Sequence, residues 1–227
     1  MASGIKRALI SVWDKAGLAP FAKELANAGV EIISTGGTAK FLEKEGIKAK
    51  EVSAITGVTE LFGGRVKTLH PKIHGGILYR RDKKEHVEQA KTAGIDPIDL
   101  VVVNLYPFEQ VAGREGTALE EAIENIDVGG PAMVRAAAKN HEHVLVVVDP
   151  NDYGWIAKAV TKDQKISEAK RRELALKAFA RTSSYDAAIC RYLSAVDKAE
   201  LFPDFLEMRF ERAYPLRYGE NPSQKAV

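Results

Sequence analysis

The residues best suited to bind an anion lie in a turn at residues 34–38, Ser-Thr-Gly-Gly-Thr. This turn follows the apolar run at residues 30–33 and precedes a helical pattern that ends near Gly46. Paired glycines let backbone N–H groups approach a phosphate closely, and a helix N-terminus adds positive potential. The hydroxyls of Ser34, Thr35 and Thr38 are further donors. We expect the turn to bind phosphate; the alternative is an ordinary glycine turn with Thr38 as the helix N-cap.

A second segment, residues 63–71, places two cations and a hydroxyl after paired glycines. Arg65 and Lys67 can bring a guanidinium and an ammonium to an anionic ligand, with the hydroxyl of Thr68 next in the chain. The alternative for this segment is a solvated basic loop.

Two histidines at the end of this segment have the spacing of metal ligands on a helix. His70 and His74 are four residues apart, but Pro71 lies between them and no helix is evident there. We expect these histidines to be structural, and we expect no metal.

Polar residues also follow the most apolar stretch of the chain. Residues 99–104, Asp-Leu-Val-Val-Val-Asn, are typical of a central parallel strand. Asn104 and Tyr106 lie at its carboxyl end, where open parallel sheets bind their ligands. The alternative is that they cap the strand and pack a turn.

A further candidate turn for an anion or a substrate is the segment at residues 126–131, Ile-Asp-Val-Gly-Gly-Pro. Pro131 suits the first position of a helix, on which Arg135 and Lys139 would share one face. A surface cationic pair is the alternative, although the alanine-rich stretch at residues 132–138 indicates a helix with little solvated surface.

Strands and helices alternate through the first 150 residues, which predicts a parallel sheet covered by helices. After Pro150 the alternation stops, and residues 167–195 form a long amphipathic helical pattern. We expect an α/β core at residues 1–150 and a helical extension of the same domain at residues 151–212. The apolar stripe of the long helix either packs onto its own sheet or joins two copies of the chain. It comprises Leu174, Ala178, Tyr185, Ile189 and Leu193.

The composition argues for a globular protein and leaves room for a local cationic pocket that binds a small anion. The 227 residues are 45% hydrophobic, and the formal net charge of +2 argues against a dedicated nucleic-acid binder. The single cysteine, Cys190, cannot form an internal disulfide, and no segment is long and apolar enough to span a membrane. We expect a soluble cytosolic protein whose ligand is a small phosphorylated molecule.

Taken together, these segments resemble the inosine monophosphate (IMP) cyclohydrolase domain family of bifunctional purine-biosynthesis enzymes. The matching segments occur in family order and are residues 11–15, 34–40, 63–71, 104–108, 127–130 and 135–141. The tail at residues 216–222 resembles the opening of the partner domain, aminoimidazole carboxamide ribonucleotide (AICAR) transformylase. We therefore expect residues 213–227 to be a linker and the start of a transformylase domain in a longer protein.

The resemblance implies a methylglyoxal synthase-like α/β fold and a reaction without cofactor or metal. The reaction closes the ring of 5-formamido-imidazole-4-carboxamide ribonucleotide (FAICAR) to give IMP and water. The resemblance also implies a homodimer. Its catalytic residues would be Lys67, Tyr106, Asp127 and Lys139. Its substrate-binding residues would be Ser11, Trp13, Asp14, Lys15, Ser34, Thr35, Gly36, Gly37, Thr38, Arg65, Val66, Thr68, Val103, Asn104, Val128 and Gly129.

One substrate-binding position departs from the family pattern: Trp13 stands where relatives often carry a small hydroxyl residue. Two alternatives share the fold. Methylglyoxal synthase itself needs a carboxylate base for a triose phosphate, and the regulatory module of carbamoyl phosphate synthetase only senses nucleotides. The presence of both Lys67 and Lys139 favours the cyclohydrolase.

Overall fold

The computed structural model describes residues 4–59, 61–106 and 108–196, together with the single residues 210, 214, 216, 217, 221 and 223. The segment predicted to be a linker, residues 213–227, therefore lies largely outside the described residues. The same holds for residues 197–212 of the predicted helical extension.

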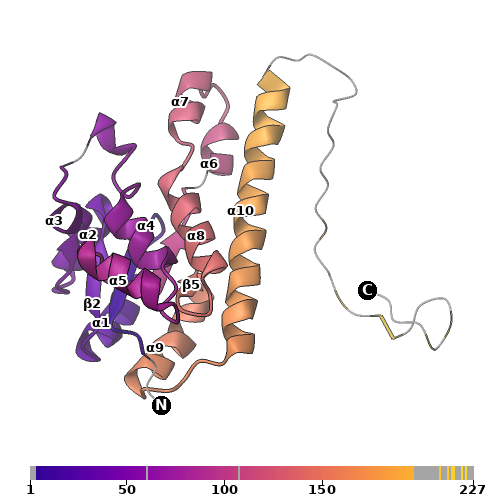
Figure 1. The fold of residues 1–227 in the computed structure, drawn as a ribbon. Coiled ribbons are helices and arrows are strands. Elements are labelled where there is room, and N and C mark those ends of the chain that lie inside the picture. The colour runs from indigo at the N-terminus through magenta and orange to yellow at the C-terminus, as the bar shows by residue number, and fades with distance from the viewer. Residues whose placement is uncertain are drawn as a thin grey trace.

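A five-stranded sheet lies among the helices at the centre of the domain (Figure 1). Its strand order is β3-β2-β1-β4-β5, and all strands pair in parallel. The central strand β4 (Leu100–Asn104) is apolar and buried from Leu100 to Val103, as a strand covered on both faces must be. The other strands are β1 (Arg7–Val12), β2 (Glu31–Ser34), β3 (Lys50–Glu51) and β5 (Leu145–Val147). The expected parallel sheet between helices is confirmed.

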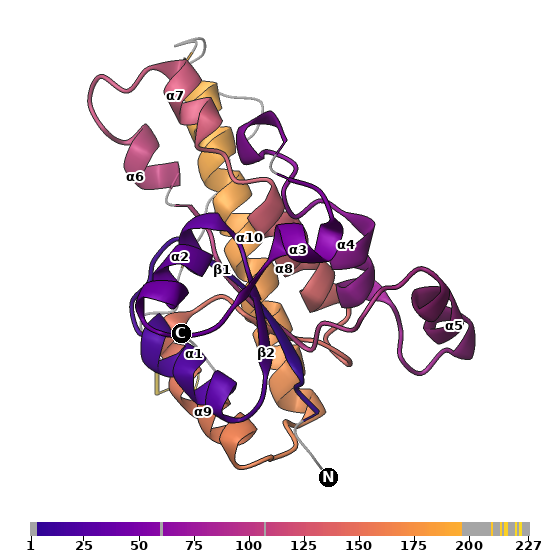
Figure 2. The same cartoon turned by 90° about the vertical axis from the view of Figure 1, so that its left-hand side faces the viewer.

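Helices cover both faces of the sheet (Figure 2). One layer contains α1 (Leu18–Asn27), α2 (Gly36–Lys44) and α9 (Tyr153–Thr161), with α1 packed on α9. The other contains α4 (Pro71–Leu78), α8 (Gly129–Lys139) and α10 (Glu168–Val196), with α8 between α4 and α10. The shorter helices are α3 (Val52–Thr56), α5 (Lys84–Thr92), α6 (Phe108–Ala112) and α7 (Leu119–Glu124).

The strand order reverses direction between β1 and β4. From β1 the chain moves through α1 to β2 and then through α2 to β3, whereas from β4 it moves through α8 to β5 on the other side. Because right-handed crossovers that run in opposite directions place their helices on opposite faces, the loops after β1 and β4 diverge. The carboxyl ends of these two strands therefore frame the crevice where such sheets bind ligands.

The long helix α10 belongs to this core. The structure places its stripe residues Leu174, Ala178 and Tyr185 in the core and Ile189 against it, and α10 contacts α8, β5 and α6. Only Leu193 of the stripe is exposed. The stripe packs onto its own domain, so it gives no separate argument for a dimer.

Two expectations about local structure and one alternative were wrong. The helix after the Gly-Gly turn begins at Gly129 rather than Pro131, because both glycines enter its first turn. The alternative that made Thr38 the N-cap of α2 is also wrong, because the N-cap is Thr35. A helix, α4, follows His70, where we saw no helical pattern: Pro71 occupies its first turn, and the His70 Nδ1 accepts a hydrogen bond from the Lys72 N–H at 3.1 Å.

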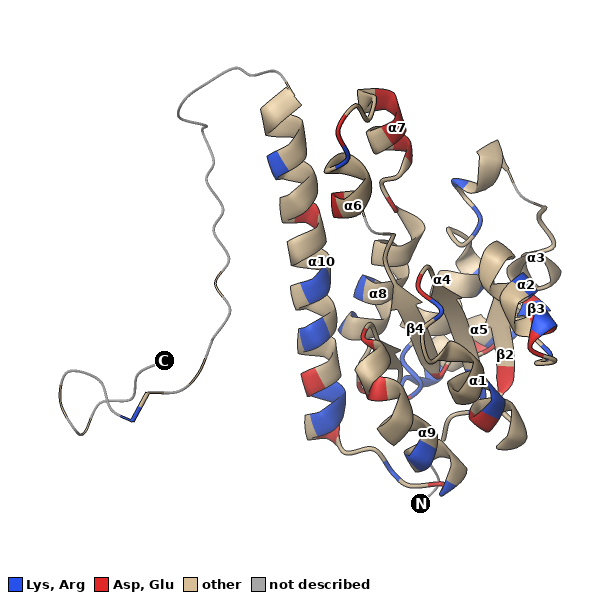
Figure 3. Cartoon of the chain, turned by 180° about the vertical axis from the view of Figure 1, so that it is seen from behind, with Lys and Arg blue, Asp and Glu red and all other residues tan. Residues whose placement is uncertain are grey.

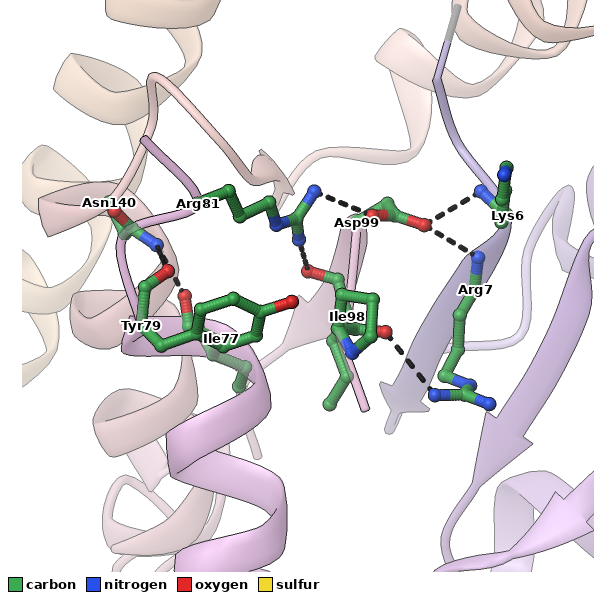
Figure 4. A network of polar contacts seen from close by, with 9 residues as sticks. Lys6, Arg7, Ile77, Tyr79, Arg81, Ile98, Asp99 and Asn140 are labelled. Atoms are coloured by element: carbon green, nitrogen blue, oxygen red, sulfur yellow. Dashed lines mark hydrogen bonds and ion pairs between the residues drawn. The ribbon is translucent and has the colours of Figure 1, made fainter. Parts of the chain in front are cut away.

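A buried carboxylate stabilises the amino-terminal ends of the two central strands, β1 and β4 (Figure 4). Asp99, just before β4, accepts hydrogen bonds from the backbone N–H groups of Lys6 at 2.7 Å and Arg7 at 2.9 Å. It also pairs with the Arg81 guanidinium at 2.6 Å, which in turn donates to the Ile98 carbonyl at 2.8 Å. This network joins the starts of β1 and β4 to the segment after α4. It thereby fixes the positions of the two strands whose carboxyl ends lie at the ligand crevice.

Candidate active site

A cavity of about 830 Å³ lies at the carboxyl ends of β1, β2 and β4. Its size falls within the range of small-molecule sites. Fifteen of the residues predicted from the sequence line it. They are Ser11, Trp13, Lys15, Thr35, Gly36, Gly37, Thr38, Arg65, Lys67, Thr68, Asn104, Tyr106, Asp127, Val128 and Gly129.

The turn from β2 into α2 forms one wall of the cavity. Thr35 has an extended backbone and caps α2, and its hydroxyl shares a hydrogen bond with that of Ser11 at 2.8 Å. Gly36 follows with φ of +27°, a conformation that a side chain would strain. Because the first N–H groups of a helix have no acceptor within the helix, this wall offers backbone donors to an anion.

Two hydroxyls of this turn are already engaged with β1. Ser34 is fully buried and donates to the Ile10 carbonyl at 2.8 Å, and it does not line the cavity. Thr38 donates to the Val12 carbonyl at 2.9 Å and accepts from the Val12 N–H at 3.2 Å. The expectation that Ser34 and Thr38 donate to phosphate is therefore not supported: the Ser34 proton joins β2 to β1, and the Thr38 proton joins α2 to β1.

Lysine ammonium groups lie on both sides of this wall. The Lys15 ammonium donates to the carbonyls of Val12 and, at 2.9 Å, Trp13, and burial lowers its pKa. The Lys67 Nζ lies so close to Gly36 that a Cβ at that position would be only 2.8 Å away. The Lys67 charge therefore adds to the positive potential at the start of α2.

Asn104 joins the loop after β1 to the end of β4. Its Oδ1 accepts hydrogen bonds from the N–H groups of Trp13 at 2.5 Å and Asp14 at 3.0 Å, while its Nδ2 donates to the Asp14 carbonyl at 2.9 Å. The Trp13 ring is 46% exposed and the Tyr106 ring 50% exposed, so both aromatic groups face an open cavity.

Asp127 is the most perturbed carboxyl group of the cavity. Its Oδ1 accepts a hydrogen bond from the Gly130 N–H at 2.8 Å, in the first turn of α8. Burial raises the pKa of the Asp127 carboxyl, and hydrogen bonds from the N–H groups of Gly130 and Tyr106 oppose part of this rise. A Cβ at Gly130 would stand 2.2 Å from the Asp127 Oδ2, so any side chain at position 130 would displace the Asp127 carboxylate. A partly buried carboxyl group of raised pKa suits proton transfer.

The outer rim of the cavity is apolar and acidic, and sequence motifs did not predict it. It includes Phe62, Ile123 and Glu124, from the turn at Phe62–Gly64 and from α7. Acidic residues occupy much of α7 (Figure 3), where Glu124 pairs with Arg65. Arg65 is therefore partly neutralised at the rim. These rim residues belong to no sequence motif that is typical of phosphate binding or proton transfer. Their place in the site could therefore be found only from the folded structure.

Four further predicted residues do not line the cavity: Asp14, Val66, Val103 and Lys139. Val103 is buried in the sheet, and Asp14 acts through its backbone, on Asn104. Lys139 is the last residue of α8 and is exposed. At a rise of about 1.5 Å per residue, it lies roughly 15 Å along the helix from Gly129. Within one chain the structure therefore does not bring Lys139 to the other candidates.

Comparisons with known proteins agree with this fold and site. The MGS-like domain family matches residues 17–132, and the AICARFT/IMPCHase bienzyme family matches residues 137–227. The chain belongs to the MGS-like domain family.

Its relatives narrow the comparison. Over 98% of its length, the chain is 53% identical to the "Bifunctional purine biosynthesis protein PurH" of Bacillus subtilis and 53% identical to that of Persephonella marina. It spans 43% of the length of each of these proteins. The crystal structure of ForH is 35% identical, with a TM-score of 0.74, and the match covers 84% of this chain and all of ForH. The described residues contain no helix long and apolar enough to cross a bilayer.

Proposed function

We propose that this chain is an IMP cyclohydrolase, which converts FAICAR to IMP and water in purine biosynthesis. The observation that carries the proposal is the single cavity that joins a phosphate-binding wall at Thr35–Gly37 to Lys67, Tyr106 and Asp127. Its relatives are bifunctional purine-biosynthesis proteins, and a bienzyme family with an IMPCHase part matches the chain. Both support the assignment.

The proposed reaction needs one molecule held in one conformation, because its carboxamide nitrogen must attack its own formyl carbon. Fixing both groups in attack geometry supplies much of the acceleration. The start of α2 and the Lys15 ammonium would hold the phosphate, while the residues at the ends of β4 and α7 would face the base.

Proton transfers complete the ring closure. Asp127 accepts a proton from the carboxamide nitrogen as the new C–N bond forms, and its raised pKa makes it a stronger base than an exposed aspartate. Lys67 stabilises the negative charge that develops on the formyl oxygen. That oxygen takes up two protons, one originating from each nitrogen, and leaves as water. Tyr106 is the proposed donor for this departure.

An assay of the purified chain tests the proposal. FAICAR should yield IMP, and Asp127→Asn should lower turnover at least tenfold while the variant stays folded, because an amide cannot accept the proton. Dihydroxyacetone phosphate should give no methylglyoxal. Turnover of the triose phosphate would favour the methylglyoxal synthase alternative, and tight IMP binding without any turnover would favour a nucleotide-sensing module.

Lys139 enters this proposal only through a second copy of the chain. We propose a homodimer that brings Lys139 of one copy to the cavity of the other. The outer face of α10 supports an interface: Leu176 and Phe179 are exposed there, and the Arg135 guanidinium lies 5.6 Å from the Phe179 ring centroid. Exposed apolar side chains beside α8 suit a two-fold contact.

Mixing two inactive variants tests this arrangement. Lys67→Ala and Lys139→Ala should each lose at least tenfold in turnover, since a lost donor to transition-state charge costs roughly that much or more. Half of the randomly mixed dimers are hybrids with one intact cavity, so an equal mixture should regain about a quarter of the normal activity. A mixture as inactive as its components would exclude a shared site.

Two further proposals rest on the resemblance and the composition. We propose that the chain works beside a transformylase domain, as in the bifunctional relatives that it partly spans. We also propose a cytosolic location, which is consistent with the lone Cys190. Fractionating cells that express the protein and probing for its mass would test both.

A further inference from the structure

The candidate base Asp127 is contacted by the long helix α10, which lies outside the cavity. The Asp127 N–H donates a hydrogen bond of 2.8 Å to the hydroxyl oxygen of Tyr185, which is 58 residues further along the chain. Tyr185 lies near the middle of α10, which runs beside α8 and α6 (Figure 1). The loop that carries Asp127 into the cavity thus rests on an element that does not line the cavity.

Tyr185 is placed to act as a rigid support. Its side chain is only 2% exposed, and its ring packs edge to face on Phe108 of α6, with centroids 6.3 Å apart. Burial raises the pKa of its hydroxyl, so the group stays neutral near pH 7 and its oxygen remains a hydrogen-bond acceptor. A side chain locked by packing holds its partner more accurately than an exposed one.

Asp127 is consequently held at both ends of the residue. Its carboxylate accepts hydrogen bonds from the N–H groups of Gly130 and Tyr106. Its own N–H donates to Tyr185, which ties the backbone of residue 127 to a different helix, α10.

We propose that Tyr185 is a positioning residue for the cyclohydrolase reaction, because its hydroxyl sets where the Asp127 carboxylate stands in the cavity. This inference rests on the proposed function. Tyr185 does not touch the substrate; it acts only through Asp127. Its loss should therefore lower the rate of the chemical step more than it weakens binding, since the phosphate-binding wall lies on β2 and α2.

The chain offers a matched control on the same helix. Tyr192, two turns further along α10, also packs edge to face on Phe108, with centroids 5.5 Å apart. Within the described residues its hydroxyl makes no hydrogen bond to the Asp127 loop. Tyr192→Phe and Tyr185→Phe thus remove the same atom from the same helix, and only the second removes a contact to Asp127.

Steady-state kinetics of the two variants test the proposal. Tyr185→Phe should lower kcat about tenfold or more, because small misplacements of a reacting group are costly, while KM changes by less than about threefold. Tyr192→Phe should keep both parameters within about twofold of the wild-type values. Equal kinetics for Tyr185→Phe and the wild type, or equal losses in both variants, would overturn the inference.

Two further measurements separate this inference from the proposed function and from misfolding. In the NMR spectrum the Asp127 amide proton should move upfield in Tyr185→Phe and stay in place in Tyr192→Phe; an unmoved signal overturns the inference even if the chain has no cyclohydrolase activity. Should Tyr185→Phe fail to fold, 3-fluorotyrosine at position 185, assayed at a pH low enough to keep its phenol neutral, retains the ring and the hydroxyl but has a weaker acceptor oxygen. An unchanged kcat in that protein would equally overturn it.

Discussion

A single methyl group at Gly36 tests whether Lys67, from its position beside α2, stabilises the charge that develops during ring closure. In Gly36→Ala the new Cβ would stand 2.8 Å from the Lys67 Nζ, whereas ordinary contacts begin at 3.4 Å. The ammonium must therefore retreat by about 0.6 Å or swing away, because the backbone of α2 cannot move without breaking its contacts to β1. The φ of +27° adds strain, and a side chain in a left-handed conformation costs about 1–2 kcal/mol of stability.

The expected loss of rate follows from the strength of a charged hydrogen bond. Such a bond contributes roughly 1.5–3 kcal/mol, which corresponds to about 10- to 100-fold in rate, so Lys67→Ala should lower kcat for FAICAR by that range. Gly36→Ala displaces the ammonium rather than removing it, and should lower kcat by about tenfold.

Steady-state kinetics with FAICAR for the two single variants and the double variant give the decisive comparison. If Gly36→Ala acts by displacing Lys67, it should cost little further kcat once Lys67 is alanine, so the two losses are not additive. Gly37→Ala is the control for stability: its Cβ would meet no atom within 4 Å, so Tm should rise slightly there and fall in Gly36→Ala. Fully additive losses, or a Gly36→Ala variant with the kcat of the wild type, would refute this role of Lys67.

Three other predictions concern the ligand, the pH and metals. Inosine should bind far more weakly than IMP in calorimetry, because it lacks the dianion that the start of α2 and Lys15 are proposed to hold; equal affinities would make the turn merely structural. Because burial raises the pKa of Asp127, kcat/KM should fall as the pH drops through a value above the ordinary aspartate range, and a profile flat down to pH 4 would contradict its role as a base. Activity should survive EDTA, since no cluster of three or more His, Cys, Asp or Glu suited to a metal occurs among the described residues; loss of activity that zinc restores would show otherwise.

The parts of the site that sequence could predict are those encoded locally. A glycine pair between an apolar strand and a helical pattern identifies the turn at Thr35–Gly37, and a continuous β-branched run identifies β4. Parallel strands then bring Asn104 and the turn to one edge without further information, because their carboxyl ends meet there.

The parts that sequence could not predict depend on contacts far apart in the chain. The spacing of Arg135 and Lys139 gives a shared helix face but not the distance of that face from the cavity. A hydroxyl in a glycine turn suggests a phosphate-binding site. However, the Ser34 hydroxyl donates its hydrogen bond to the carbonyl of Ile10, a residue that is its neighbour only in the folded sheet. From the sequence, Tyr185 is indistinguishable from the other apolar positions of an amphipathic helix. Nothing near it in the chain indicates that its hydroxyl accepts a hydrogen bond from Asp127.

The cavity consists of two halves that meet where the sheet reverses direction. The half that would hold phosphate comes from β1, β2 and α2, and the half that would handle protons comes from β4 and α8. Val12 and Asn104 are paired in the register of β1 and β4, and Asn104 bonds across to the loop after β1. For a ring closure within one molecule, the distance between these halves matters more than the number of reactive groups, because it selects the substrate conformation that reacts. A strand pair at the centre of the sheet sets that distance more rigidly than any surface loop would.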